Sequence, residues 1–320
     1  MKMSNILSMI PKKECEITKK STEYLDKYLF PFEKPDGTRE GYFELVLSFE
    51  KYLQDDKYLS SITFPVDMKY LEVRLEDNND LRIYNLTFTD EDEVNLYKKI
   101  TDIIPLHIEY LKCNYCSLVR FNQFTQLKTL KIFDGDSWQP FYALPESLVR
   151  LELFIQGYDS NLDNLPSNLK YLFIDEMCSD KYADGYSHPL DNLPHSLEVL
   201  FFPERYFYSN TNYSGNLHNL PSGLKYLYLP SHLSIKTDYN NLPDSLEIIV
   251  FNDYPEIVEN IDRYPGSLKK IYSNMWYSNS NNAQYEKVNK KIKSLNLEGK
   301  FDIYYGIKPL DFEKFEYFKY

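Results

Sequence analysis

A ten-residue pattern of hydrophobic and polar positions recurs along the central part of the chain. Its template is Leu-Pro-x-Ser-Leu-x-x-Leu-x-Leu, found in residues 144–153, 165–174, 193–202, 220–229 and 242–251 and, in weaker form, in 264–273. Earlier versions occupy residues 64–73 and 104–113. The final Leu-x-Leu alternates with a period of two residues, so each copy predicts a short strand with one face in a core.

The spacing of the template indicates a stacked repeat. Successive template prolines from Pro145 to Pro265 are 21, 28, 27, 22 and 22 residues apart, and the two earlier gaps are 40 residues each. Spacings in the twenties are typical of leucine-rich repeats. Each 40-residue gap predicts a further repeat without proline, with its strand in residues 127–132 in one gap and 83–88 in the other. About nine or ten repeats are expected in total.

Stacking of the repeats predicts columns of equivalent core residues. One column contains Leu151, Leu172, Leu200, Leu227 and Ile249, and a second contains Leu148, Leu169, Leu197, Leu224 and Leu246. The proline before each strand and the small polar residue two positions later indicate a turn. We therefore interpret the recurring Ser147, Ser196, Ser245 and Ser267 as turn residues and not as nucleophiles.

The template is preceded by Asn-Leu-Asp-Asn at 161–164, Pro-Leu-Asp-Asn at 189–192 and Asn-Leu-His-Asn at 216–219. In this form it resembles the FNIP-type leucine-rich repeats of amoebae and of giant DNA viruses that infect amoebae. The resemblance covers roughly residues 60 to 275. It implies a leucine-rich-repeat solenoid, α/β-type or mostly β, with short parallel strands on the concave face and loops or short helices on the convex face.

The two ends of the chain lack the template and are expected to cap the array. We assign residues 1–60 to an N-terminal cap region, 61–275 to the solenoid, and 276–320 to a C-terminal cap and tail. The N-terminal region predicts a helix over 21–30 and a strand over 42–49. The C-terminal region predicts a helix over 283–293, followed by a hairpin of residues 294–297 and 300–305 about Glu298-Gly299.

Composition and charge narrow the partner classes. Hydrophobic residues make up 43% and charged residues 26% of the chain, which predicts a folded protein. The net charge of -12 disfavours nucleic acid and anionic membranes as partners. The apolar run at residues 6–10 is too short for a signal peptide, and no later run approaches a membrane span, so a cytoplasmic protein is expected, or a virion component if the chain is viral.

No set of residues with the spacing of a catalytic or metal site is found in the sequence. Cys113 and Cys116 have the spacing of half a zinc site, but no second pair follows, and Cys113 falls on a core position of its repeat. None of the five histidines has metal-ligand spacing, and Asp134-Gly-Asp136 lacks the other ligands of a calcium loop. We therefore expect a protein that is not an enzyme and has no cofactor and no metal.

The residues that alternate with the core positions predict an inner face whose character changes along the array. In the early repeats they are charged or mixed, whereas from residue 165 onward they are apolar. We hypothesise that the apolar set forms an exposed partner-binding patch on the concave face: Tyr171, Phe173, Val199, Phe201, Tyr226, Tyr228, Ile248 and Val250. Phe173, Phe201 and Tyr228 are the expected anchors. The alternative is that the C-terminal tail or a loop covers this patch internally.

These features favour a non-enzymatic protein-protein interaction module whose partner is another protein or, by self-association, a second copy. A structural or assembly subunit, for example of a viral particle, is the alternative. A third possibility follows from the resemblance, because some members of the family carry an F-box that recruits a ubiquitin ligase. Residues 6–11 are only weakly similar to the F-box motif.

Overall fold

The fold is built on one sheet of twelve strands arranged in chain order. The computed structural model describes residues 17–19, 42–47, 57–66, 68–75, 98–114, 121–133, 144–154, 161–175, 189–201, 217, 219–229, 240–251, 263–273, 286 and 290–305. The strands are β1 (Ile17–Lys19), β2 (Tyr42–Leu47), β3 (Tyr70–Leu75), β4 (Tyr110–Asn114), β5 (Thr129–Phe133), β6 (Arg150–Phe154), β7 (Tyr171–Asp175), β8 (Val199–Phe201), β9 (Tyr226–Leu229), β10 (Ile248–Phe251), β11 (Lys270–Ser273) and β12 (Asp302–Tyr305).

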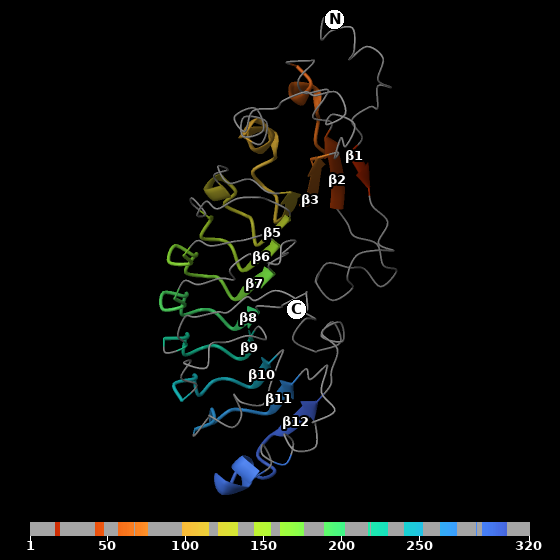
Figure 1. Ribbon diagram of the computed structural model, residues 1–320. Coiled ribbons are helices and arrows are strands. Elements are labelled where there is room, and N and C mark those ends of the chain that lie inside the picture. The colour runs from red at the N-terminus through yellow and green to blue at the C-terminus, as the bar shows by residue number, and fades with distance from the viewer. Residues whose placement is uncertain are drawn as a thin grey trace, which may run out of the picture.

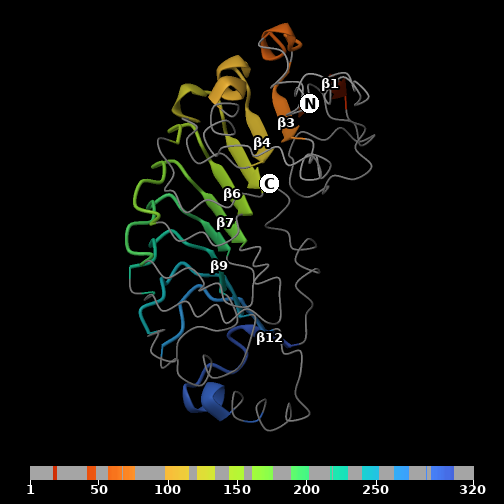
Figure 2. The same cartoon turned by 45° about the horizontal axis from the view of Figure 1, so that its top comes forward.

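The strands form a curved, solenoid-like stack. β1 is antiparallel to β2, and from β2 to β12 each strand is parallel to the next one along the chain. The strands lie on the inner side of an arc, and the turns that lead into them lie on its outer side (Figures 1 and 2). Two short 3-10 helices, η1 (Leu59–Ser61) and η2 (Phe121–Gln123), belong to the early repeats. The predicted repeat architecture of short parallel strands is confirmed.

Each template forms a turn immediately before its strand. In the repeat of β6, the carbonyl oxygen of Pro145 accepts a hydrogen bond from the amide of Leu148 (3.0 Å). Proline suits this position because its ring fixes φ and it has no amide that needs a partner. The amides of Val149 and Arg150 then both donate to the carbonyl oxygen of Lys128 in the preceding repeat, at 2.8 and 2.9 Å. The same arrangement recurs along the array and aligns each repeat with its neighbour.

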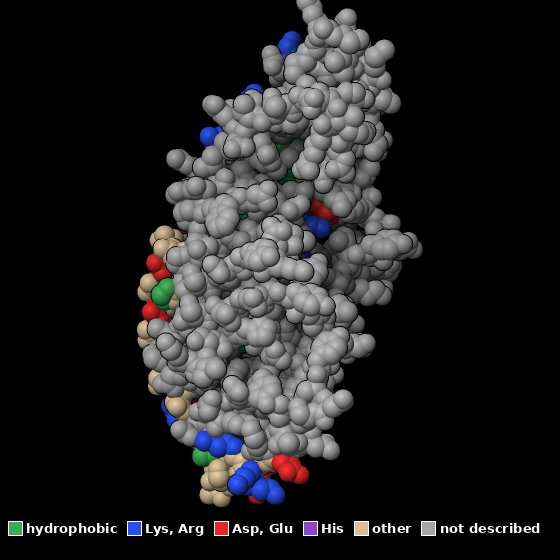
Figure 3. All heavy atoms as spheres, viewed as in Figure 1, with side chains coloured by type: hydrophobic (Ala, Val, Ile, Leu, Met, Phe, Trp, Pro, Cys, Tyr) green, Lys and Arg blue, Asp and Glu red, His purple; other side chains and the backbone are tan. Residues whose placement is uncertain are grey.

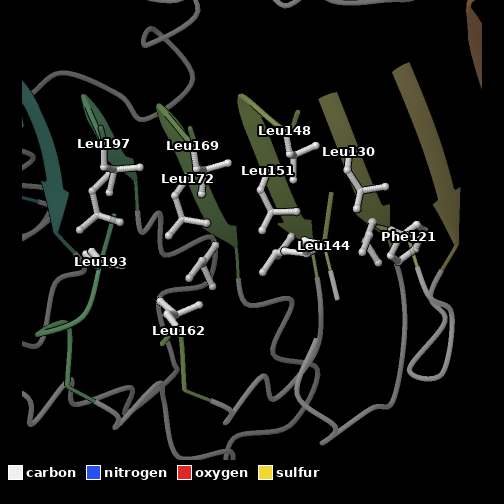
Figure 4. Packing of buried hydrophobic residues seen from close by; sticks show 14 of the residues in the cluster. Phe121, Leu130, Leu144, Leu148, Leu151, Leu162, Leu169, Leu172, Leu193 and Leu197 are labelled. Carbon is white, nitrogen blue, oxygen red and sulfur yellow. The ribbon is translucent and has the colours of Figure 1, made fainter. Parts of the chain in front are cut away.

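The core lies between the strands and the outer turns. Both predicted leucine columns are fully buried, and in each repeat the two leucines point to the same side of the sheet (Figure 4). The strand register pairs Leu151 with Leu172, Leu172 with Leu200, and Leu200 with Leu227. Where side chains are coloured along the outer margin of the turns, Figure 3 shows acidic and basic groups together with hydrophobic ones.

The recurring serines join one repeat to the previous one. The hydroxyl of Ser196 donates to the carbonyl oxygen of Leu169 at 2.6 Å, and Ser147 and Ser245 make the equivalent bonds at 2.8 and 2.6 Å. These contacts satisfy carbonyl groups at the inner end of the turn, which would otherwise lack a partner there. The interpretation of the serines as turn residues is confirmed by their positions.

We expect Ser196→Ala to lower the free energy of unfolding by about 1 kcal/mol, because the carbonyl oxygen of the buried Leu169 loses the Ser196 hydroxyl as its hydrogen-bond donor. Chemical denaturation would measure the difference. The matched control is Ser222→Ala, since Ser222 is exposed in the equivalent turn of another repeat. Equal effects of the two substitutions would show that the cross-repeat bond contributes nothing.

Two sequence predictions about strands are corrected by the structure. β3 pairs directly with β4, so no strand from residues 83–88 stands between them; those residues lie outside the described part of the chain. The predicted C-terminal hairpin is also wrong, because residues 290–294 are helical and β12 pairs in parallel with β11. Asn296 (φ 55°) ends that helix in a left-handed conformation, with the Leu297 amide donating to the Ile292 carbonyl oxygen at 3.1 Å.

The sheet continues into both segments that were expected to form caps. β1 and β2 lie within residues 1–60, and β12 lies within residues 276–320. The predicted strand over 42–49 is observed as Tyr42–Leu47. The predicted strand in residues 127–132 is observed as Thr129–Phe133. The predicted helix over 21–30 lies outside the described residues, and residues 98–103 are helical.

Candidate functional site

The face of the sheet opposite the leucine core, here called the inner face, carries two rows of side chains. The strand register aligns them as the sequence predicted. The first row contains Tyr70, Tyr110, Thr129, Arg150, Tyr171, Val199, Tyr226, Ile248 and Lys270. The second contains Glu72, Lys112, Lys131, Glu152, Phe173, Phe201, Tyr228, Val250 and Tyr272. The inner face is therefore charged or mixed over β3–β6 and apolar over β7–β10, and charged residues return at Lys270 on β11 and Asp302 on β12.

The apolar half of the inner face forms a second hydrophobic cluster, and it is buried within the single chain. The rings of Phe173 and Phe201 lie 5.2 Å apart between centroids, and those of Phe201 and Tyr228 lie 4.4 Å apart. Of the eight predicted residues, Tyr171 and Phe201 are half-buried, and the other six are buried. The prediction that these residues form an exposed patch is wrong, although they do gather on one face. The alternative of internal cover agrees with the burial, but the described residues do not show which segment provides it.

The charged half of the inner face is also buried, and its charges are paired between strands. Glu72 on β3 contacts Lys112 on β4 at 2.9 Å. Glu152 on β6 contacts Lys131 on β5 at 2.7 Å and also binds the Nε of Arg150. Burial of charges requires such pairing, because an isolated buried ion loses its hydration without compensation. The sequence alternation placed these residues on the inner face but gave no sign that they are buried.

Glu152 is the centre of this charge cluster. Burial alone would raise the pKa of the Glu152 carboxyl, but Arg150 and Lys131 outweigh that effect and hold its pKa below the usual value. Burial lowers the pKa of the Lys131 ammonium, and Glu152 opposes the shift. The guanidinium of Arg150 also lies 4.6 Å from the ring centroid of Phe173, within the range of a cation–π contact. Arg150 thus links the charged and the apolar halves of the inner face.

A third row of side chains lies at the edge where the strands begin. It contains the residue directly before each of the strands β3 to β11, in the order Lys69, Glu109, Lys128, Val149, Lys170, Glu198, Lys225, Glu247 and Lys269. We call it the edge row. Each member donates its backbone amide to the carbonyl oxygen of the preceding member, at 2.8 or 2.9 Å, so the nine residues are consecutive in space. Lysines stand before every odd strand, and glutamates before every even strand except β6.

Two glutamates of the edge row, Glu109 and Glu198, each bridge the lysines on either side of them. Glu109 contacts Lys69 at 3.1 Å and Lys128 at 2.8 Å, through separate carboxylate oxygens. Glu198 contacts Lys170 at 3.0 Å and Lys225 at 2.7 Å in the same way. The hydrogen bond from the nearer lysine is the largest cause of the lowered pKa of each carboxyl. Glu247 contacts Lys269 at 2.6 Å and completes the row.

The sequence analysis did not find the edge row. The edge row corresponds to the sixth position of the ten-residue template. The alternation of lysine and glutamate at this position can be seen only when the repeats are aligned and compared in order. Within any single repeat, one exposed lysine or glutamate looks like an ordinary solvated residue.

We expect Val149→Glu to raise the free energy of unfolding by about 0.5 to 1 kcal/mol, because it supplies the missing carboxylate between Lys128 and Lys170. Thermal or chemical denaturation at low salt would measure the gain. Val149→Gln is the matched control, since it has similar size and polarity without the charge. A gain of the same size for glutamine would exclude an electrostatic origin.

The candidate metal and redox residues do not form a site in the described part of the chain. Within it, no group of three or more His, Cys, Asp or Glu side chains is arranged to hold a metal ion. Cys113 packs against the leucine core, as its template position predicted, and Cys116 lies outside the described residues. Among the described segments, no helix has both the length and the apolar character needed to cross a membrane. No family model matches the chain, and no significant match to a curated protein was found.

Proposed function

We propose that the chain is a leucine-rich-repeat solenoid of the FNIP type that acts by binding another protein, without a catalytic step. The observation that carries this proposal is the unbroken parallel register from β3 to β11, which repeats the same side-chain positions along one extended surface. Solenoids use such surfaces to bind partners, because a long regular face offers many contact points at once. The template sequences and the proline turns support the repeat family.

The burial of the inner apolar cluster changes where binding is expected. Phe173 and Tyr228 are buried, so they now support the fold of the repeats in which they lie. A triple change of Phe173, Phe201 and Tyr228 to serine would remove buried rings and is no longer a clean test of binding. In the described part of the array, the edge row is an exposed set of side chains with a regular pattern of charge. We therefore propose that the protein binds its partner there and that it acts in the cytoplasm.

Affinity capture of the tagged, full-length chain from its native cell, followed by mass spectrometry, tests the proposal. We expect a protein partner that also binds the purified chain in a saturable manner. The control is capture with the tag alone, because contaminants should be recovered with it, whereas partners that recognise the array should not. Recovery of the chain alone, together with a multimeric mass in light scattering, would favour the assembly subunit. Recovery of ubiquitin-ligase subunits would favour a substrate-recognition role.

A further inference from the structure

The edge row presents cations to solvent even though the chain as a whole is acidic. Its five lysine side chains are 44% to 64% exposed, whereas its three glutamates are 19% to 27% exposed. Five ammonium groups are paired with three carboxylates, so the row carries a net charge of +2 on a chain whose net charge is -12. The glutamates lie beneath the lysines and hold them in place.

Each lysine of the edge row retains capacity to bind a further anion. Among the described residues, the ammonium groups of Lys69 and Lys128 form ion pairs with Glu109, and those of Lys170 and Lys225 form ion pairs with Glu198. An ammonium group has three N–H donors, so each of these lysines keeps donors that face solvent. Because its partner glutamate already restricts the side chain, less conformational entropy is lost when a second carboxylate binds.

The spacing of the lysines selects the kind of ligand. They stand before alternate strands, and neighbouring strands lie about 4.8 Å apart, so successive lysines are about 10 Å apart along the edge. A polyproline-II segment rises about 3.1 Å per residue with three residues per turn, so every third residue recurs on one side after about 9 Å. Adjacent phosphates of a nucleic-acid strand are closer than this spacing, and the overall negative charge of the chain disfavours nucleic acid.

We propose that the edge row binds an extended acidic segment of a partner protein, in which a carboxylate at every third residue meets successive lysines. This inference rests on the proposed function and names the chemistry of the partner. The segment lies across the strands, along the edge where they begin. Its apolar residues between the carboxylates can contact Val149, which interrupts the row of charges between Lys128 and Lys170.

The test uses the full chain and fluorescein-labelled peptides. The matched probe is Glu-Pro-Pro repeated once for each lysine of the row, and the control has the same composition with its glutamates contiguous. In fluorescence anisotropy, we expect the matched peptide to bind about tenfold more tightly, because only it can form all the exposed ion pairs together. The affinity of the matched peptide should be lower at an ionic strength of about 0.15 M than at low ionic strength, because salt screens exposed charges. Equal affinity of the two peptides, or tighter binding of an oligouridylate than of the matched peptide, would overturn the proposal.

Two variants connect binding to the edge row. Lys170→Gln combined with Lys225→Gln should weaken binding of the matched peptide about tenfold, whereas the change of the exposed Lys293 and Lys300 to glutamine, outside the row, should not. Val149→Glu should weaken binding without lowering the melting temperature, since it places a carboxylate within the row. Unchanged peptide binding by both row variants would refute the inference.

The two proposals can fail separately. If the purified chain binds a captured partner but not the matched peptide, the interaction function stands and the edge-row inference is refuted. If no partner is captured and the peptide does not bind, both are refuted.

Discussion

Glu152→Gln is expected to lower the free energy of unfolding by about 3 kcal/mol or more, because it leaves Lys131 and Arg150 buried without their common carboxylate. Glutamine keeps the size and some hydrogen bonding of glutamate, so the loss reports mainly on charge. The low exposure of all three side chains means that water cannot replace the missing ion. Urea denaturation of the variant and the parent would measure the difference.

The matched control for this prediction is Glu198→Gln. Glu198 also bridges two cations, Lys170 and Lys225, but in the exposed edge row. The same chemical change should therefore cost only about 0 to 1 kcal/mol there, because solvent screens the exposed ions. A similar cost at both positions would mean that the inner charges are hydrated in solution and not buried as the structure shows.

The contribution of Glu152 should also depend on pH. Its pKa in the folded protein lies below the usual value, which in an unfolded chain is about 4.3. A carboxyl with a lowered pKa stabilises the fold fully above its unfolded pKa, and this stabilisation is lost as pH falls through the folded pKa. The difference in stability between the parent and Glu152→Gln should therefore narrow as the pH is lowered below about 4. A difference that stays constant with pH would contradict the assigned charge state.

Leu200→Ala is expected to lower the free energy of unfolding by about 2 to 5 kcal/mol, because Leu200 is fully buried in the middle of the array. Its neighbours Leu172 and Leu227 are fixed by strand pairing on both sides, so the cavity can collapse only partly. Native proteins are stable by about 5 to 15 kcal/mol, so the loss should be visible as a lower melting temperature.

The chain provides a close control for this substitution. Leu106→Ala makes the same chemical change at a leucine that is 57% exposed, in the turn before β4. Its effect should stay within about 0.5 kcal/mol. A cost at Leu106 as large as that at Leu200 would contradict the predicted repeat register.

The core positions of the repeats could be predicted from the sequence because the alternation within each repeat and the stacking of successive repeats require the same residues to be buried. Leu148 and Leu151 could be assigned to the core from alternation and from the proline turn alone, and the structure confirms both. Alternation could also place Phe173 and Glu152 on the inner face. It could not show that this face is buried, because the template does not specify what covers the side of the sheet opposite the leucine core. Exposure was therefore the wrong assumption for the apolar half of the inner face.

The two errors in strand assignment have a different origin. Residues 83–88 have the alternation of a strand, but β3 (ending at Leu75) and β4 (beginning at Tyr110) pair directly, so the 34 residues between them place no strand between β3 and β4 in the sheet. Residues 294–297 belong to the end of a helix, where the left-handed conformation of Asn296 turns the chain toward β12. In both places a short hydrophobic alternation was not enough to predict the strand pairing, which depends on the rest of the fold.

The alternation of charge along the edge row limits how an array of this kind can change its length. Within the stretch from Lys170 to Lys269, removal or duplication of a single internal repeat brings two lysines or two glutamates into neighbouring positions, whereas removal or duplication of two adjacent repeats restores the order of opposite charges. Like charges at this distance repel, and opposite charges attract. Repeats should therefore be gained and lost in pairs. The charge alternation, in addition to the leucine core, then favours keeping the number of repeats odd or keeping it even as the array changes length.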